Sequence, residues 1–166
     1  FIPEKDDTET AYYAGGCFWG VEYFMKSTEG VISIDAGYIG GIEENPNYNM
    51  VCSGQTNYAE AVKIIFNPTI TTYEDLTKLF FEIHDPTQLN KQGPDVGKQY
   101  RSEIFYTNDK QKLIADSLIN ILKNKELSVV TKVSKATKFY KAEEYHQNYY
   151  QYNAAFPYCH AYKKRF

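Results

Sequence analysis

Alternating apolar and polar residues mark out five short strands along the chain. Successive side chains of a strand point to opposite faces, so a half-buried strand alternates with a period of two. The run 60–66 ends at Asn67-Pro68, because proline cannot donate to a strand ladder. The predicted strands are 10–14, 31–38, 60–66, 102–106 and 129–136.

Helical spacing of apolar residues predicts four helices. Thr72 and Asn108 are typical N-cap residues, and Asp75 stands at the capping-box position that follows Thr72. The predicted helices are 17–26, 72–83, 108–125 and 142–152, and the third is expected to bury Leu113, Leu118, Ile121 and Leu122.

The order of these elements predicts an α+β fold. Its first six elements follow the order β-α-β-β-α-β of the ferredoxin-like α/β plait, with appended helices and a long C-terminal coil. We expect a single domain over 1–166, with 1–9 frayed and 153–166 forming a mobile tail. The polar stretch 84–99 is long for a loop in a compact domain, and such loops are usually functional.

Charge and hydrophobicity exclude several classes of protein. The net charge is −3, which would not attract nucleic acid or an anionic membrane. No apolar run approaches the roughly 18 residues of a membrane span, and no signal peptide is visible. From the scattered cysteines alone we expect a cytoplasmic protein, although the chain does not begin with Met and a removed targeting segment is compatible with it.

The cysteines are too few and too scattered for a disulfide framework or a structural zinc site. The chain has Cys17, Cys52 and Cys159, no CxxC motif, and three histidines. Such thiols fit a reducing compartment or a redox enzyme that cycles. We expect no metal and no other cofactor.

Cys17 has the setting of an activated nucleophile. It lies in Gly15-Gly16-Cys17-Phe18-Trp19-Gly20, where a predicted strand turns into a predicted helix. Unpaired N–H groups and the positive end of the dipole at a helix N-terminus favour a thiolate and lower a thiol pKa. The adjacent rings of Phe18 and Trp19 are suited to an apolar pocket for a methyl group. The alternative is a buried cysteine that packs as a small hydrophobe.

Several blocks in order make the chain resemble the peptide methionine sulfoxide reductases of the A type, from Tyr13 to Cys159. The blocks that carry the resemblance are Gly15-Gly16-Cys17-Phe18-Trp19-Gly20, Gly37-Tyr38-Ile39-Gly40-Gly41, Asn45-Pro46-Asn47-Tyr48, Val51-Cys52-Ser53-Gly54, Ala59-Glu60-Ala61-Val62, His84-Asp85-Pro86-Thr87-Gln88, Gln92-Gly93-Pro94-Asp95-Val96-Gly97, Gln99-Tyr100-Arg101-Ser102 and Ala142-Glu143-Glu144-Tyr145-His146-Gln147. The chain departs from the family at Asn57-Tyr58, where Gly-His is usual, and at Lys98, where Thr is usual.

The resemblance implies an enzyme that reduces methionine S-sulfoxide, free or in proteins, through a Cys17 sulfenic acid. It implies that Glu60 is the acid, kept protonated by burial at the head of an apolar strand. Tyr48 and Tyr100 would donate hydrogen bonds to the sulfoxide oxygen, and Asp95 would orient the site.

The resemblance also implies how the enzyme resets. Pro157-Tyr158-Cys159 resembles the tail segment that carries the recycling cysteine, so Cys159 would resolve the sulfenic acid and thioredoxin would reduce the disulfide. Cys52 matches a position with no established part in thiol exchange. We expect a monomer.

Two other functions stay open on the residues alone. A cysteine acyl hydrolase would pair Cys17 with His84 or His146 as base, whereas the resemblance makes His84 a structural neighbour of the loop that carries Asp95. A binding module would hold an oxidised or methylated ligand in the aromatic pocket without turnover. Activity of purified protein on a methionine sulfoxide peptide with dithiothreitol separates the three.

Overall fold

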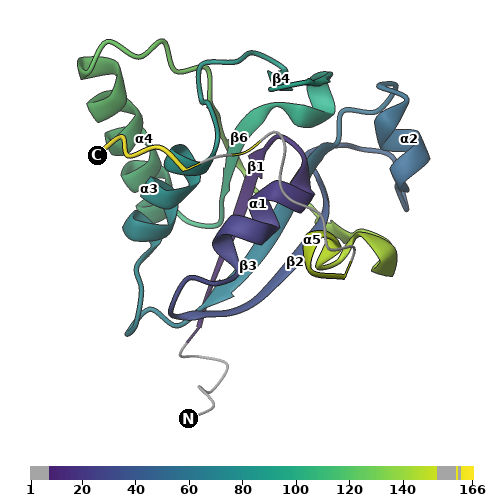
Figure 1. The fold of residues 1–166 in the computed structure, drawn as a ribbon, viewed down its shortest axis with the longest axis horizontal. Helices are drawn as coiled ribbons and strands as arrows, with labels where there is room; N and C mark the ends of the chain where they lie inside the picture. The colour runs from purple at the N-terminus through teal and green to yellow at the C-terminus, as the bar shows by residue number, and fades with distance from the viewer. Residues whose placement is uncertain (1–7, 153–159, 161) are drawn as a thin grey trace.

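The structure is a computed structural model that describes residues 8–152, 160 and 162–166 (Figure 1). It has a mixed α+β fold around one six-stranded sheet. The strands are β1 (Glu9–Gly15), β2 (Val31–Ile39), β3 (Ala59–Phe66), β4 (Lys91–Gln92), β5 (Asp95–Val96), β6 (Ser102–Tyr106), β7 (Lys132–Lys135) and β8 (Tyr140–Lys141). The helices are α1 (Phe18–Met25), α2 (Tyr48–Cys52), α3 (Tyr73–Ile83), α4 (Asp109–Asn124) and α5 (Tyr149–Tyr152), with 3-10 turns η2 (Lys98–Tyr100) and η3 (Glu144–His146).

The sheet has the strand order β7-β6-β1-β3-β2-β8. Its pairs are antiparallel except β6 with β7, which is parallel and joined through α4. The register places Glu60 of β3 opposite Tyr38 of β2. β4 and β5 form a separate two-stranded hairpin.

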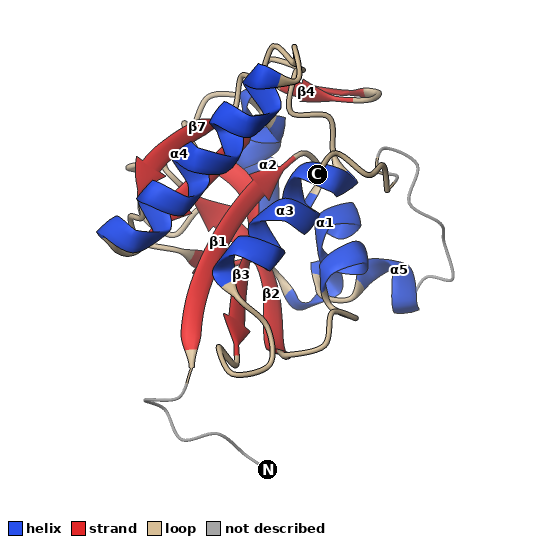
Figure 2. Ribbon diagram, turned by 90° about the vertical axis from the view of Figure 1, so that its left-hand side faces the viewer, coloured by secondary structure: helices blue, strands red, loops and turns tan. Residues whose placement is uncertain are grey.

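Three helices cover one face of the sheet. Figure 2 shows α4, α3 and α1 side by side, and contacts join α3 to both of its neighbours. The main apolar core lies between these helices and the sheet. It includes Phe18, Phe80 and Leu118, all of which are buried. A smaller cluster around Phe105, with Ala14 and Ile39, occupies a second apolar layer.

The predicted helix caps at Thr72 and Asn108 are confirmed. The Thr72 side chain accepts a hydrogen bond from the Asp75 N–H, and that of Asn108 accepts one from the Gln111 N–H, at 3.0 and 2.9 Å. Each bond satisfies an N–H that has no partner within its helix. The two helices therefore begin one residue after the predicted caps.

The predicted buried face of α4 is partly wrong. Leu118 and Leu122 are buried, but Leu113 is 70% exposed and Ile121 is 42% exposed. The buried face of α4 consists of residues spaced three, four and seven positions apart. It includes one polar and one small side chain as well as larger apolar ones. Its buried members are Gln111, Ala115, Leu118, Ile119 and Leu122.

The predicted helix over 142–152 is wrong. The segment contains only the turn η3 and the short α5. Between them, the Gln147 side chain bonds to both the N–H and the C=O of Ala36, each at 2.9 Å. Asn148 has a positive φ of 53°, which is not helical. A side chain that pairs with a strand edge has replaced the local helical bonds.

Two loops of the prediction contain secondary structure. The stretch between the strands predicted over 31–38 and 60–66 contains α2, and Cys52 is the last residue of this helix. The polar stretch 84–99 contains the β4–β5 hairpin and the start of η2. The strand predicted over 129–136 shortens to β7, and β8 follows it at the opposite edge of the sheet.

The chain ends that the structure describes are held by hydrogen bonds. Glu9, predicted to be frayed, is the first residue of β1 and lies opposite Phe66. At the other end, the Arg165 side chain donates to the carbonyl oxygens of Phe81 and His84 at the end of α3, at 2.7 and 3.4 Å. The predicted tail therefore has an anchored end, whereas Cys159 lies outside the described residues. In the described part of the chain no helix is both long and apolar enough to cross a membrane.

Candidate active site

Cys17 stands at a tight turn between β1 and α1. It is the N-cap of α1, is 5% exposed, and its carbonyl oxygen accepts the Gly20 N–H at 3.2 Å. Gly16 has a positive φ of 95°, and a Cβ there would lie 2.6 Å from the Cβ of Gln92. Only glycine allows both this backbone conformation and this close approach. The turn therefore places the thiol at the positive end of the helix, as predicted.

Glu60 reaches the same helix end from β3. Its side chain is 1% exposed, and its Oε1 accepts the N–H of Phe18 at 3.3 Å. Phe18 directly follows Cys17, so this bond brings the carboxyl group to the residue next to the candidate nucleophile. A separation of 42 residues in the chain is closed by the pairing of β1 with β3.

Tyr48 and Tyr100 approach from α2 and η2. Burial raises the pKa of both hydroxyls, and the nearby carboxyl group of Glu60 raises them further. The thiol of Cys17 also raises the pKa of Tyr48. Both hydroxyls therefore keep their protons and can act as hydrogen-bond donors at neutral pH.

Cys52 lies among these groups, although the sequence assigned it no role in catalysis. Tyr48 and Cys52 are four residues apart on α2 and share one face of it. Burial raises the pKa of the Cys52 thiol, and the nearby hydroxyls of Tyr48 and Tyr100 oppose this effect without outweighing it. Helical spacing from Tyr48 was the sequence signal for this position.

Asp95 joins the site from the β4–β5 hairpin, inside the stretch predicted to be a functional loop. Its charge raises the pKa of Cys52 and of Tyr100, after the larger effect of burial. In Figure 1, α2 and the β4 hairpin lie in the right-hand half of the molecule, as does α5.

Phe18 and Trp19 form an aromatic cluster with His146. Phe18 is fully buried and Trp19 is half-buried, with their ring centroids 6.5 Å apart. The His146 ring lies 5.2 Å from Phe18, 5.6 Å from Trp19 and 4.4 Å from Tyr48. Tyr149 stacks on Trp19 with a centroid distance of 3.7 Å and an interplanar angle of 7°. The cluster therefore borders on the group of polar residues through Tyr48.

The two histidines considered as bases have other partners. The Nδ1 atom of His146 accepts the Trp19 indole N–H at 3.0 Å, and burial lowers the pKa of His146. The ring nitrogens of His84 contact the Phe80 carbonyl at 2.6 Å and the Ser102 hydroxyl at 2.8 Å. Burial lowers the pKa of His84 to about 3. Both rings therefore stay neutral, and His84 has the structural role that the sequence predicted.

Glu143, for which the sequence implied no role, connects the site to the sheet. Its carboxylate accepts hydrogen bonds from the Tyr38 hydroxyl, the Tyr48 N–H and the Tyr145 hydroxyl, at 3.1, 3.4 and 2.8 Å. Burial alone would raise its pKa, but these bonds lower it overall. Glu143 is therefore an anionic anchor for the first residue of α2.

The two departures from the family pattern lie beside each other. The Lys98 ammonium group donates to the Asn57 side-chain oxygen at 3.2 Å. The Arg101 side chain donates to the Asn57 carbonyl at 2.8 Å. Asn57 and Lys98 thus form one local contact that joins the loop before β3 to η2.

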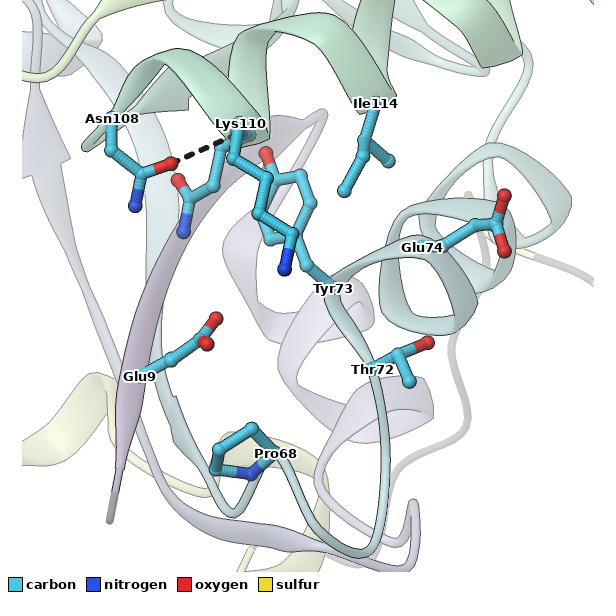
Figure 3. A pocket seen from close by; sticks show the side chains of 9 residues that line it. Glu9, Pro68, Thr72, Tyr73, Glu74, Asn108, Lys110 and Ile114 are labelled. Carbon is cyan, nitrogen blue, oxygen red and sulfur yellow. Dashed lines mark hydrogen bonds between the residues drawn. The ribbon is translucent and has the colours of Figure 1, made fainter.

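A cavity of about 390 Å³ lies apart from these residues (Figure 3). It is bordered by the start of α3, the start of α4 and the beginning of β1. Its lining includes Glu9, Tyr73 and Lys110, but none of the candidate site residues. In the described part of the chain, no group of three or more His, Cys, Asp or Glu side chains could hold a metal ion.

Known proteins are similar to this chain in sequence and in fold. The family model for peptide methionine sulfoxide reductase matches residues 9–166. Peptide methionine sulfoxide reductase MsrA of Methanococcus maripaludis is 50% identical over 145 residues, which are 87% of this chain and 92% of the relative. MsrA 1 of Rhodopirellula baltica is 50% identical over 161 residues, 96% of this chain and 84% of the relative. The reduced form of Mxr1 from Saccharomyces cerevisiae has a TM-score of 0.90 and 34% identity, covering 98% of this chain and 96% of Mxr1. The chain belongs to the peptide methionine sulfoxide reductase family.

Proposed function

We propose that this chain reduces methionine S-sulfoxide, free or in proteins, with Cys17 as the nucleophile. The observation that carries the assignment is that a thiol, a carboxyl group and two tyrosine hydroxyls lie together at the start of α1. Cys17 caps the helix, Glu60 binds the next N–H, and two protonated tyrosines stand beside the carboxyl group. A nucleophile, an acid and neutral donors are the parts that removal of a sulfoxide oxygen requires.

In the proposed reaction the oxygen atom passes from the substrate to Cys17. The Cys17 thiolate attacks the sulfoxide, one proton is delivered to the oxygen, and the substrate sulfur leaves as a thioether. Cys17 then carries the oxygen as sulfenic acid, so the cysteine sulfur is oxidised by two electrons and the substrate sulfur is reduced by two. The proposed step uses no metal and no cofactor.

Glu60 supplies the proton, while Tyr48 and Tyr100 hold the oxygen. Burial of Glu60 favours the protonated carboxyl group that this role needs. In the ligand-free protein the two hydroxyls lie near the Cys52 thiol, and a sulfoxide oxygen is a stronger acceptor than a thiol. Asp95 orients the site next to Tyr100.

The aromatic cluster receives the substrate methyl group. Phe18 and Trp19 follow Cys17 directly, so an apolar group placed against them lies near the attacking sulfur. The pocket prefers the S epimer at sulfur, because the tyrosines fix the oxygen while the rings fix the methyl group.

Cys159 resolves the sulfenic acid in this proposal. Its thiol condenses with Cys17 to a disulfide and releases water, and thioredoxin then reduces the disulfide. The support is the tail motif Pro157-Tyr158-Cys159 in the sequence. Mxr1 of Saccharomyces cerevisiae has been solved in complex with Trx2.

We further propose that the core is a ferredoxin-like plait within a single domain. The elements β1, α1, β2, β3, α3 and β6 follow the order β-α-β-β-α-β. The four strands lie in the order β6-β1-β3-β2 and are antiparallel, which supports this topology. β7 and β8 extend the two edges of the same sheet.

The nucleophile is tested in a single turnover without a reductant. Wild-type protein and the Cys52→Ser variant should each form about one methionine per chain, and Cys17→Ser should form none. Methionine is measured by mass spectrometry after mixing with a methionine sulfoxide peptide. The pair is matched, because Cys52 is a second free thiol close to the site. Substantial methionine formation by Cys17→Ser would overturn the assignment.

A further inference from the structure

Glu22 is a buried carboxyl group that the proposed reaction does not use. It lies on α1, one turn after Phe18 and Trp19, and is 1% exposed. Its Oε1 accepts the Asn148 N–H at 2.6 Å, and the Tyr149 N–H also bonds to the carboxyl group. Burial of a carboxyl group is costly unless hydrogen bonds compensate for it. Here the compensation comes from the backbone at the start of α5.

These bonds hold the residue that stacks on Trp19. Asn148 has a positive φ of 53°, so the chain turns sharply just before Tyr149. The Tyr149 ring then lies parallel to the Trp19 indole, at 3.7 Å and 7°. On the same α1 turn, the indole N–H is fixed by the Nδ1 atom of His146. Trp19 is therefore held by two residues of the segment that Glu22 anchors.

We propose that Glu22 is a positioning residue, which fixes the turn at Asn148 so that Tyr149 packs against Trp19 and sets the shape of the methyl pocket. Its effect on the substrate passes through Trp19, and it touches no reacting atom. The inference rests on the proposed function only for the role of Trp19 in the pocket.

The chemistry of the carboxyl group argues against a packing role alone. In the described structure the second oxygen, Oε2, is buried without a hydrogen-bond partner. Burial raises the pKa of Glu22 to about 7, against the opposing effect of the backbone N–H groups and of Lys26. An apolar side chain would fill this place without that cost. What an apolar side chain lacks is an acceptor for the two N–H groups.

The stack can be observed directly, because Trp19 is the single tryptophan of the chain. Its fluorescence and its quenching by acrylamide report the Tyr149 contact without any substrate. Glu22→Leu removes the acceptors, and Glu22→Gln keeps one carbonyl oxygen in the same place. Tyr149→Ala removes the stacked ring, whereas Tyr149→Phe keeps it and is the matched control.

We expect Glu22→Leu and Tyr149→Ala to shift the Trp19 emission and to increase its quenching in the same way. The double variant should go no further than either single variant, because both act through one contact. The KM for a methionine sulfoxide peptide should rise about tenfold, a loss close to that of one charged hydrogen bond, while the single-turnover rate at saturation stays within about threefold. Glu22→Gln should recover most of both effects.

Folding of each variant is checked by circular dichroism and urea unfolding. Unchanged Trp19 emission and quenching in folded Glu22→Leu would overturn the proposal, and so would additive effects in the double variant. A changed emission with unchanged KM in both Glu22→Leu and Tyr149→Ala would overturn the control of substrate binding. That last result would also count against Trp19 as a pocket wall in the proposed function, whereas Cys17→Ser tests the reaction itself.

Discussion

At the scale of single residues, the site depends on contacts between side chains and backbone N–H groups. Glu60 binds the N–H of Phe18, and Glu22 binds that of Asn148. Each carboxyl group is buried, so its protonation depends on the number and strength of such bonds as well as on burial. The same residue type is thus proposed to be a proton donor in one place and an anchor in the other.

Replacement of Glu60 by Gln should remove the proton donor and keep its shape. We expect the single-turnover rate of Glu60→Gln to fall by about 10²- to 10⁴-fold, the usual effect of losing a general acid. The measurement is rapid quenching with detection of methionine. Glu82→Gln is the control, because Glu82 is a buried glutamate on α3 outside the site. A rate for Glu60→Gln within a few-fold of wild type would assign the proton to a tyrosine.

Replacement of Trp19 by Ala should weaken substrate binding and reduce the choice between epimers. An apolar pocket distinguishes one methylene group by about 10- to 200-fold, so a loss within that range is expected for methionine S-sulfoxide. The separated S and R epimers are offered to wild-type, Trp19→Ala and Trp19→Phe protein, and the consumption of each is followed. Equal consumption of both epimers by the wild-type protein would contradict the proposed pocket.

At the scale of elements, short segments from distant parts of the chain surround the start of α1. α2 brings Tyr48 and Cys52, the β4–β5 hairpin brings Asp95, and η3 brings His146. Each segment is too short to be stable alone, because a helix or hairpin of this length does not repay its ordering entropy. Side-chain anchors such as Glu143 and Gln147 hold α2 and η3 against β2.

Substitution of Cys159 in the C-terminal segment should separate methionine formation from the recycling of the enzyme. Cys159→Ser should still form about one methionine per chain, because Cys17 alone completes the first step. With thioredoxin, thioredoxin reductase and NADPH, the variant should not turn over, whereas dithiothreitol should restore turnover. Normal cycling of Cys159→Ser with thioredoxin would remove the resolving role from Cys159 and make Cys52 the next thiol to test.

At the scale of the whole molecule, two buried ionisable groups make stability depend on pH in opposite directions. His84 has a pKa lowered to about 3 by burial, and Glu22 has a pKa raised to about 7 by burial. Below pH 6.5 the unfolded chain protonates His84 while the folded chain does not, so stability is lost as the pH falls toward 3. Glu22 gives stability that is complete below pH 4.5 and is lost as the pH rises through 7.

Replacement of Glu22 by Gln should therefore change the pH dependence of stability. Between pH 4.5 and 7, the free energy of unfolding of Glu22→Gln should rise more steeply with pH than that of wild type. Lys26 and Asp35 face this carboxyl group and remain in the variant. Urea unfolding at several pH values measures the effect, with exposed Glu29→Gln as control. Parallel curves for wild type and Glu22→Gln would show that Glu22 titrates alike in both states.

The sequence by itself determined the helices and strands that have clear local signals, such as helix caps and alternating apolar residues. Thr72 and Asn108 end in oxygens that cap helices, and the alternating run 60–66 forms a strand wherever one face is buried. It also determined the setting of Cys17, because a glycine turn between a strand and a helix is a local property. The family motifs named Glu60, Tyr48, Tyr100 and Asp95 on the same local basis.

Only the tertiary structure decided which of these groups meet and which side chains replace local bonds. The helix predicted over 142–152 gave way because Gln147 pairs with the edge of β2, a partner 111 residues away. Glu22 could not be placed from the sequence, since its partner Asn148 comes from another segment. The approach of Tyr100 to Cys52 was also decided by the fold, although the spacing of Tyr48 and Cys52 was visible in the sequence. The propensity of a segment to form a helix or a strand depends on residues that are close in sequence. Burial and long-range hydrogen bonds depend instead on how the sheet brings distant segments together.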